Sequence, residues 1–349
     1  MRRPPPTETL AATDEWFLRN GLSYFVPEQR RGAKAALSLR RTLPLLVLTG
    51  LAAAAAGAGL ALVADEFSFA PATLVTIGML AATWYALTAL NARPIVTWAL
   101  SRTFGSVRTL LPMMSRALPL LLVFVTFLFI NAEVWQVTSR LDGGVLWLTA
   151  LLFGLLSVAF LLVRLPEEVD RTDDHVDDEL LLSACRGTPL EEVSRELVED
   201  PASDPRAHAE VTGFERWNLV LVLVIVQTVQ VLLLAFTVFV FFVLFGSLVM
   251  TNDVVVVWIG EERVHALPYL PNVTAELFQV SVFLAAFSGL YLTVSTVTDE
   301  TYREQFFSSV QHQLERAVGV RAVYLALRER DDRAEAAPTQ VIESPEQFG

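Results

Sequence analysis

Residues 217–250 read WNLVLVLVIVQTVQVLLLAFTVFVFFVLFGSLVM, and this apolar run decides the fold class. It contains no proline, and its one glycine, Gly246, lies near its end. A helix rises 1.5 Å per residue, so these 34 residues extend about 50 Å, well past the roughly 30 Å hydrocarbon core of a bilayer. The run therefore predicts one helix that crosses a membrane once and tilts or projects beyond it.

Five further apolar segments accompany this run. We place them at 43–64, 72–90, 117–134, 144–163 and 276–297. The chain has 349 residues, is 53% hydrophobic and has only 18% charged residues, against about 25% in soluble domains. This composition predicts an all-α, polytopic transmembrane helical bundle of about six spans, with cytosolic amphipathic helices.

The basic residues predict the orientation. If the N-terminus is cytosolic, 24 of the 26 Lys and Arg residues lie inside, and only Arg140 and Arg263 lie outside. Cations concentrate in cytoplasmic loops, so we expect both termini in the cytosol. Arginine outnumbers lysine 25 to one, which is typical of a GC-rich genome and predicts a bacterial source.

These spans divide the chain into six regions. They are a cytosolic N-terminal segment with an interfacial helix (1–42), a four-helix membrane region (43–163) with a basic inner loop (91–116), an acidic cytosolic linker (164–216), a two-helix membrane region (217–297) with an outer loop (251–275), a cytosolic amphipathic helix (298–330) and a disordered tail (331–349). The Val254–Ile259 run in the outer loop fits either a small hairpin or an apolar cap on the membrane surface.

Aromatic and basic residues at the inner face predict contact with anionic lipid or with a partner. In the N-terminal segment these are Trp16 and Phe17, for which packing on the protein's own cytosolic parts is the alternative. The inner loop has no acid and contributes Arg93, Arg102, Arg108 and Arg116. Its apolar residues recur at helical spacing, so we expect an amphipathic helix on the inner leaflet, with a re-entrant segment as the alternative.

The linker 164–216 contains 16 acids and six bases. Such a run is typical of a solvated, flexible segment, here available to a cytosolic protein partner, as is 298–330. Its acids are densest from Glu167 to Glu179. Within that cluster, Asp173–Glu179 is the best candidate for a hard cation, but it lacks the glycine and ligand order of a calcium loop.

Polar side chains inside the spans are few. Gln227 and Gln230 share a face of the fifth span, where they either bond a neighbouring helix or line a polar path. Candidate partners on the sixth span are Gln279, Ser288 and Tyr291.

Signatures of catalysis are missing from the sequence. It has no HExxH, GxSxG or GxxxxGK[ST] motif, one cysteine (Cys185) and four scattered histidines. We therefore expect no enzyme activity, cofactor or metal site, and the net charge of −12 argues against nucleic acid as a partner.

The C-terminal third carries a resemblance. VSTVTDETYREQFF at 294–307 and AVYLAL at 322–327 resemble the C-terminal part of uncharacterised integral membrane proteins common in actinobacteria. The resemblance implies a bacterial plasma membrane but no activity or substrate. Two functions follow as hypotheses: a non-catalytic scaffold or regulator acting through its cytosolic face, or a small-solute transporter or channel that uses the polar faces of the fifth and sixth spans.

Overall fold

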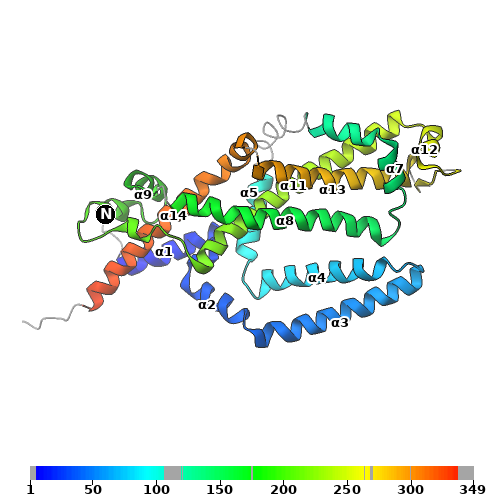
Figure 1. The fold of residues 1–349 in the computed structure, drawn as a ribbon. Helices are drawn as coiled ribbons and strands as arrows, with labels where there is room; N and C mark the ends of the chain where they lie inside the picture. The colour runs from blue at the N-terminus through cyan, green and yellow to red at the C-terminus, as the bar shows by residue number, and fades with distance from the viewer. Residues whose placement is uncertain are drawn as a thin grey trace, which may run out of the picture.

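The computed structural model describes residues 5–105, 119, 121–173, 176–262, 264–267, 270–298 and 300–336. Within these residues the protein is helical apart from one short hairpin (Figure 1). Five helices are long and apolar enough to cross a membrane: α3 (Leu39–Ala64), α4 (Phe69–Thr88), α8 (Gly144–Asp173), α11 (Gly213–Val249) and α13 (Ala275–Thr298). The predicted all-α membrane bundle is confirmed.

The bundle is centred on α13. Half of its most apolar stretch is buried, against 6% for α4, because α8 and α11 both pack along α13. The α3–α4 hairpin lies at the edge (Figure 1). It is tied to α8 where the indole N–H of Trp147 donates to the hydroxyl of Thr76 (2.7 Å) and the amide of Gly144 donates to Ser68 (3.2 Å).

The expected third span, 117–134, is not a straight helix. Residues 121–129 are helical, and the chain then bends by 75° into α7 (Ala132–Thr138). Asn131 lies at the bend and caps α7, since its side-chain oxygen accepts the amide of Glu133 at 2.8 Å. The indole of Trp135 donates to the carbonyl of Phe129 (2.6 Å) and holds the corner. The bent pair is either a broken span, which would be the sixth, or a re-entrant loop.

Helix α11 is a single unbroken helix, as its sequence predicts. Its 37 residues extend about 55 Å at 1.5 Å per residue. About 20 residues suffice for the hydrocarbon core, and counting back from Val249 this number ends near Gln230. The N-terminal part of α11 therefore projects beyond the bilayer.

That projecting part is buried in a compact unit that we call the terminal body. It comprises α1 (Pro6–Arg19), the short helix η1 (Ser23–Phe25), α2 (Pro27–Ala36), α9 (Asp178–Cys185), α10 (Glu191–Glu199), η2 (Pro205–His208), α14 (Glu300–Ala336) and the adjoining ends of α8 and α11. Helix α5 (Arg93–Gly105) lies beside α11, at the edge of the terminal body. One continuous apolar core joins these elements.

The linker expected to be flexible is part of this body. Leu181, Cys185, Leu190 and Leu197 are fully buried, and Glu191–Glu199 form the short helix α10. Arginines from other segments balance linker acids, as in the Arg330–Glu196 pair (2.8 Å). The linker is therefore a packed element, and the expectation of a solvated spacer is wrong for its described residues.

The C-terminal helix also differs from its expected form. α14 is not a surface amphipathic helix, because Val318, Val320 and Val323 are fully buried and the burial extends around the helix. It continues to Ala336, so the first residues of the expected disordered tail are helical. The tail beyond 336 lies outside the described residues.

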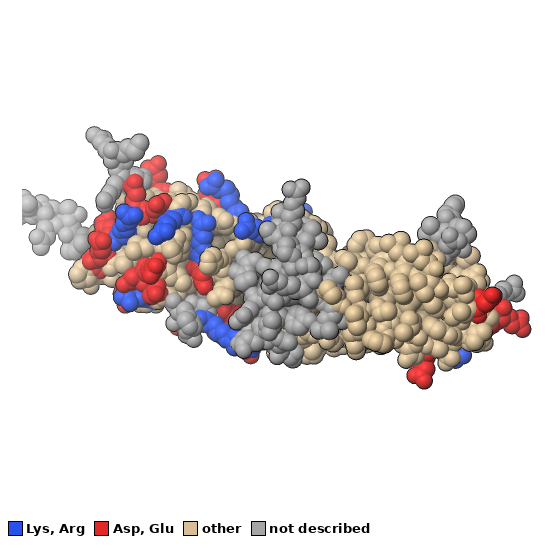
Figure 2. All heavy atoms as spheres, turned by 90° about the horizontal axis from the view of Figure 1, so that it is seen from above, with Lys and Arg blue, Asp and Glu red and all other residues tan. Residues whose placement is uncertain are grey.

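The opposite end of the bundle is closed by a distal cap. Its elements are α7, α12 (Asn252–Ile259) and the antiparallel strands β1 (Ala266–Leu267) and β2 (Leu270–Thr274). The valine run at 254–257 is thus helical, and the hairpin follows it. On the face shown in Figure 2, an uncharged belt separates the charges of the terminal body from those of the cap.

Candidate functional site

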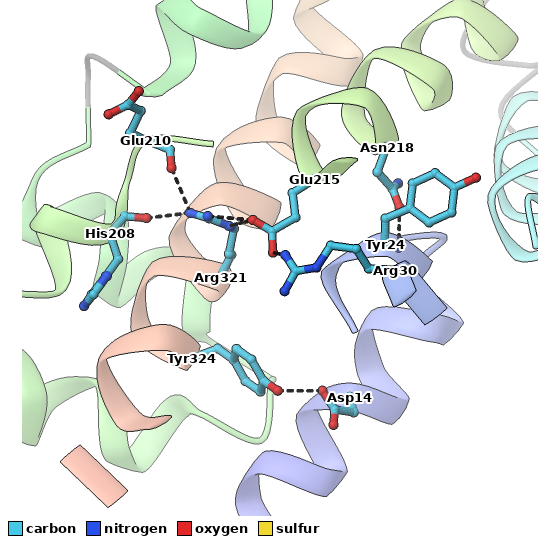
Figure 3. Close-up of polar contacts among 9 residues, drawn as sticks. All are labelled: Asp14, Tyr24, Arg30, His208, Glu210, Glu215, Asn218, Arg321 and Tyr324. Carbon is cyan, nitrogen blue, oxygen red and sulfur yellow. Dashed lines mark hydrogen bonds and ion pairs between the residues drawn. The ribbon is translucent and has the colours of Figure 1, made fainter. Parts of the chain in front are cut away.

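A buried carboxylate marks the base of α11. Glu215 lies in the first turn of the helix, and its side chain is 6% exposed. Arg30 from α2 contacts one carboxylate oxygen, and Arg321 from α14 contacts the other, with its Nε at 2.7 Å and its second nitrogen at 2.6 Å (Figure 3). One acid thus joins the N-terminal region to the C-terminal helix.

Arg321 is as deeply buried as its partner, with 9% of its side chain exposed. Its remaining terminal nitrogen donates to the carbonyls of His208 (2.6 Å) and Glu210 (3.1 Å), which end the linker (Figure 3). A buried guanidinium is costly unless its donors are matched, and here a carboxylate and two carbonyls match them. Arg321 therefore connects α14 to the start of α11 and to the end of the linker.

Asn218 extends this contact by one turn of α11. It is fully buried, accepts the amide of Tyr24 at 2.8 Å and donates to the carbonyl of Gly21 at 2.9 Å. The hydroxyl of Tyr24 reaches the carbonyl of Leu90 at 2.8 Å, just after α4 ends. Burial raises the pKa of Tyr24, so the phenol stays a donor. The N-terminal segment is thereby tied to two membrane helices.

A second polar contact lies one turn along α14. The hydroxyl of Tyr324 donates to Asp14 of α1 at 2.9 Å (Figure 3). Burial is the main cause that raises the pKa of Asp14, and the Tyr324 hydrogen bond and Arg328 oppose it. Burial also raises the pKa of Tyr324. We call these contacts of Asp14, Arg30, Glu215, Asn218, Arg321 and Tyr324 the polar junction.

The polar junction holds segments of the chain together. Two guanidinia bind the carboxylate of Glu215, and the carboxylate of Asp14 accepts the hydroxyl of Tyr324. Among the residues that the structure describes, no three His, Cys, Asp or Glu side chains are placed to hold a metal ion. In the acidic run, Asp177 accepts the amide of Leu180 (2.8 Å) and caps α9; Asp174 and His175 lie outside the described residues.

The predicted lipid-contact residues are in part placed differently. Phe17 is fully buried and packs edge-to-face on Phe25 and Tyr324, so it faces neither lipid nor a partner. Trp16 is half-buried beneath the guanidinium of Arg316. The alternative interpretation, packing on the protein's own parts, describes Phe17, whereas Trp16 packs under Arg316 and also lines a hollow at the surface.

The predicted inner-loop helix is present in part. α5 buries Ile95 and Ala99 against the protein and leaves Arg93 and Arg102 exposed. The amide oxygen of Gln313, when turned toward Arg102, accepts from its Nε (2.9 Å) and from a terminal nitrogen (3.0 Å). Arg108 and Arg116 lie outside the described residues.

The polar residues of the fifth and sixth spans do not form one site. Gln227 and Gln230 are buried, and Nε2 of the first and Oε1 of the second have no hydrogen-bond partner among the described residues. Gln279 lies at the distal end beside Asp142 (3.3 Å). Ser288 bonds its own helix at the carbonyl of Leu284, and Tyr291 stacks on Phe124.

The polar junction itself was not predicted from the sequence. A signal exists: Arg321 is a lone charge within the apolar stretch Ala317–Leu327, and Glu215 and Asn218 are three residues apart at the start of the longest apolar helix. Comparison of the chain with family models, with curated proteins and with solved structures gives no match. The function must therefore be argued from the geometry alone.

Proposed function

We propose that this protein is a non-catalytic membrane scaffold or regulator, which acts through its terminal body on the cytosolic side of a bacterial plasma membrane. The observation that carries the proposal is the polar junction. It joins both chain ends and the linker to the base of a membrane-crossing helix, which builds a rigid platform at a fixed place on the membrane. The proposed orientation rests on the sequence, in which 24 of the 26 basic residues belong to the segments expected in the cytosol.

The platform's surface favours a basic partner. The linker has ten more acids than bases, and its packing leaves Glu192, Glu199 and Glu210 exposed. Opposite charges steer association and give it a strong salt dependence. A basic segment of a cytosolic protein is the partner that this surface fits best.

The test is recovery of a stoichiometric partner in mild detergent. We expect one protein to co-purify with the wild-type chain and to dissociate between about 0.05 and 0.5 M salt, where the Debye length falls from roughly 14 to 4 Å. Replacing Glu192, Glu199 and Glu210 by Gln should lower its recovery, and the matched exposed change Arg195→Gln should not. No stoichiometric partner, or equal recovery from both variants, would contradict the proposal.

A second candidate function is supported by one observation, the two unpaired amide atoms of Gln227 and Gln230. Buried polar groups without partners are rare and occur at functional sites. If these amides line a polar path, liposomes containing the protein should leak protons or potassium, and Gln227→Leu with Gln230→Leu should stop the leak. We rank this function second because the buried hydroxyls of the neighbouring α13, among them Ser288 and Thr293, bond carbonyls of their own helix and not these amides.

A further inference from the structure

Two hollows flank Trp98 of α5 where the terminal body meets the membrane helices. The first has a volume of about 150 Å³, and its walls come from α1, α5, α11 and α14. The second is more open and lies between α1 and α5. Trp98 lines both. Both hollows therefore border α5, the helix that follows the membrane helix α4.

The position of Trp98 is fixed by a tight turn. Gly21 has a φ of +72°, and a side chain there would start 3.0 Å from the Cβ of Trp98. Glycine both permits this backbone conformation and lets α5 approach. The same turn is bonded to Asn218 of α11, so the hollows are a built feature of the polar junction's surroundings.

The charged residues that line the two hollows are all arginines, and one of them, Arg19, also lies 3.8 Å from Glu15. Arg102 and Arg316 line the first, and Arg19 and Arg93 line the second. No acid lines either hollow among the described residues. Arg316 is held by the carbonyl of Arg186 (3.0 Å) and lies over the ring of Trp16 (5.5 Å). Each hollow is thus lined by two arginines and, among the described residues, by no carboxylate.

The floor of the first hollow is apolar. Leu219 and Val222 of α11 and Leu314 of α14 form it, and Trp16 and Trp98 form its sides. Such a site matches an amphipathic ligand whose anionic group meets the arginines and whose carbon skeleton meets the floor. Arginine with tryptophan at the membrane surface is the usual setting for an anionic headgroup.

We propose that these hollows hold the phosphodiester headgroup of an anionic phospholipid from the inner leaflet. Arg102 and Arg316 bind the phosphate oxygens through charge-assisted hydrogen bonds, and Arg19 and Arg93 attract the headgroup. The site goes beyond the scaffold proposal, because it requires no protein partner. It shares with that proposal only the orientation of the terminal body.

The test counts the lipid retained by the purified chain. The protein is extracted in mild detergent, exchanged into equal amounts of phosphatidylglycerol and phosphatidylcholine, and examined by native mass spectrometry. We expect one retained phosphatidylglycerol per chain and at least a tenfold preference over phosphatidylcholine. Arg102→Gln with Arg316→Gln should reduce retention at least tenfold. Arg41→Gln, which removes an exposed charge at the start of α3, should reduce it less than twofold.

Three outcomes would overturn the proposal. They are equal retention of the two lipids, equal loss in the Arg41 control, and displacement of the lipid by millimolar inorganic phosphate, which would assign the site to free phosphate. Arg102 and Arg316 are both exposed, so their replacement leaves the core intact. An unchanged melting temperature by circular dichroism checks this, and the single variant Arg102→Gln repeats the test if the pair unfolds.

Discussion

Replacing Glu215 by Gln removes the negative charge between Arg30 and Arg321 while keeping the shape of the side chain. It leaves Arg321, whose side chain is 9% exposed, without a counter-charge in the interior. Breaking a buried ion pair in this way costs about 3–5 kcal/mol. The carbonyls of His208 and Glu210 still bind Arg321, so we expect a cost of about 3 kcal/mol, at the low end of that range.

Cys185 provides the assay in the intact membrane protein. It is the one cysteine of the chain, is fully buried in the same apolar core, and burial raises the pKa of its thiol to about 12. Alkylation therefore requires the terminal body to open, and its rate follows the population of the open form. A loss of about 3 kcal/mol should accelerate alkylation roughly 100-fold, since about 1.4 kcal/mol corresponds to a factor of ten.

The matched control is Glu196→Gln. Glu196 also pairs with an arginine of α14, Arg330, at 2.8 Å, but the two side chains are 46% and 33% exposed. Exposed pairs contribute about 0–1 kcal/mol, so alkylation should change less than about fivefold. If Glu215→Gln and Glu196→Gln gave equal rates, the polar junction would not hold the terminal body closed and the reasoning from burial would be refuted.

Three further predictions concern single contacts. Gly319→Ala adds a methyl group 2.6 Å from Cβ of Ala184 on α9, so it should lower the free energy of unfolding by about 1–3 kcal/mol and speed Cys185 alkylation; Gly50→Ala, with no neighbour within 4 Å, should not. Burial is the main cause that raises the pKa of Asp14 above 3.8, with Glu28 adding to it and Tyr324 and Arg328 opposing it. The folded state therefore binds the Asp14 proton more tightly than the unfolded state, and the stability that this proton provides is lost as pH rises through the folded pKa. Asp14→Asn should be no less stable than wild type at pH 7 in a melt followed by circular dichroism, and a marked loss would show that the charged form is needed. Gln227→Leu with Gln230→Leu removes two unpaired buried polar atoms and should leave the melting temperature equal or higher, whereas a drop would reveal bonds that these side chains make.

The membrane helices could be predicted from the sequence because each depends on local composition. The apolar run at 217–250 lies within one helix up to Val249, because it has no proline and its one glycine, Gly246, is close to its end. The bend after residue 130 was missed because hydropathy does not register a cap. Asn131 followed by Glu133 is a local capping signal that would have placed the start of α7.

The terminal body could not be predicted because its contacts join distant parts of the chain. Glu215 is 185 residues from Arg30 and 106 from Arg321. Contacts between residues so far apart produce no periodic pattern in the sequence. The acidic linker shows the same difficulty. Its charge suggests a solvated spacer, yet Leu190 and Leu197 are fully buried, and arginines such as Arg330 come from elsewhere in the chain.

The central claim is that the terminal body and the distal cap lie on opposite sides of the membrane, with the body in the cytosol. It is tested most directly by labelling intact cells with a membrane-impermeant maleimide. In a Cys185→Ala background, cysteines replace Glu192 on the terminal body and Glu261 after α12, both of which are exposed. The account predicts that position 261 is labelled in intact cells and position 192 only after permeabilisation. Labelling of both positions from the same side, or the reverse order, would contradict it.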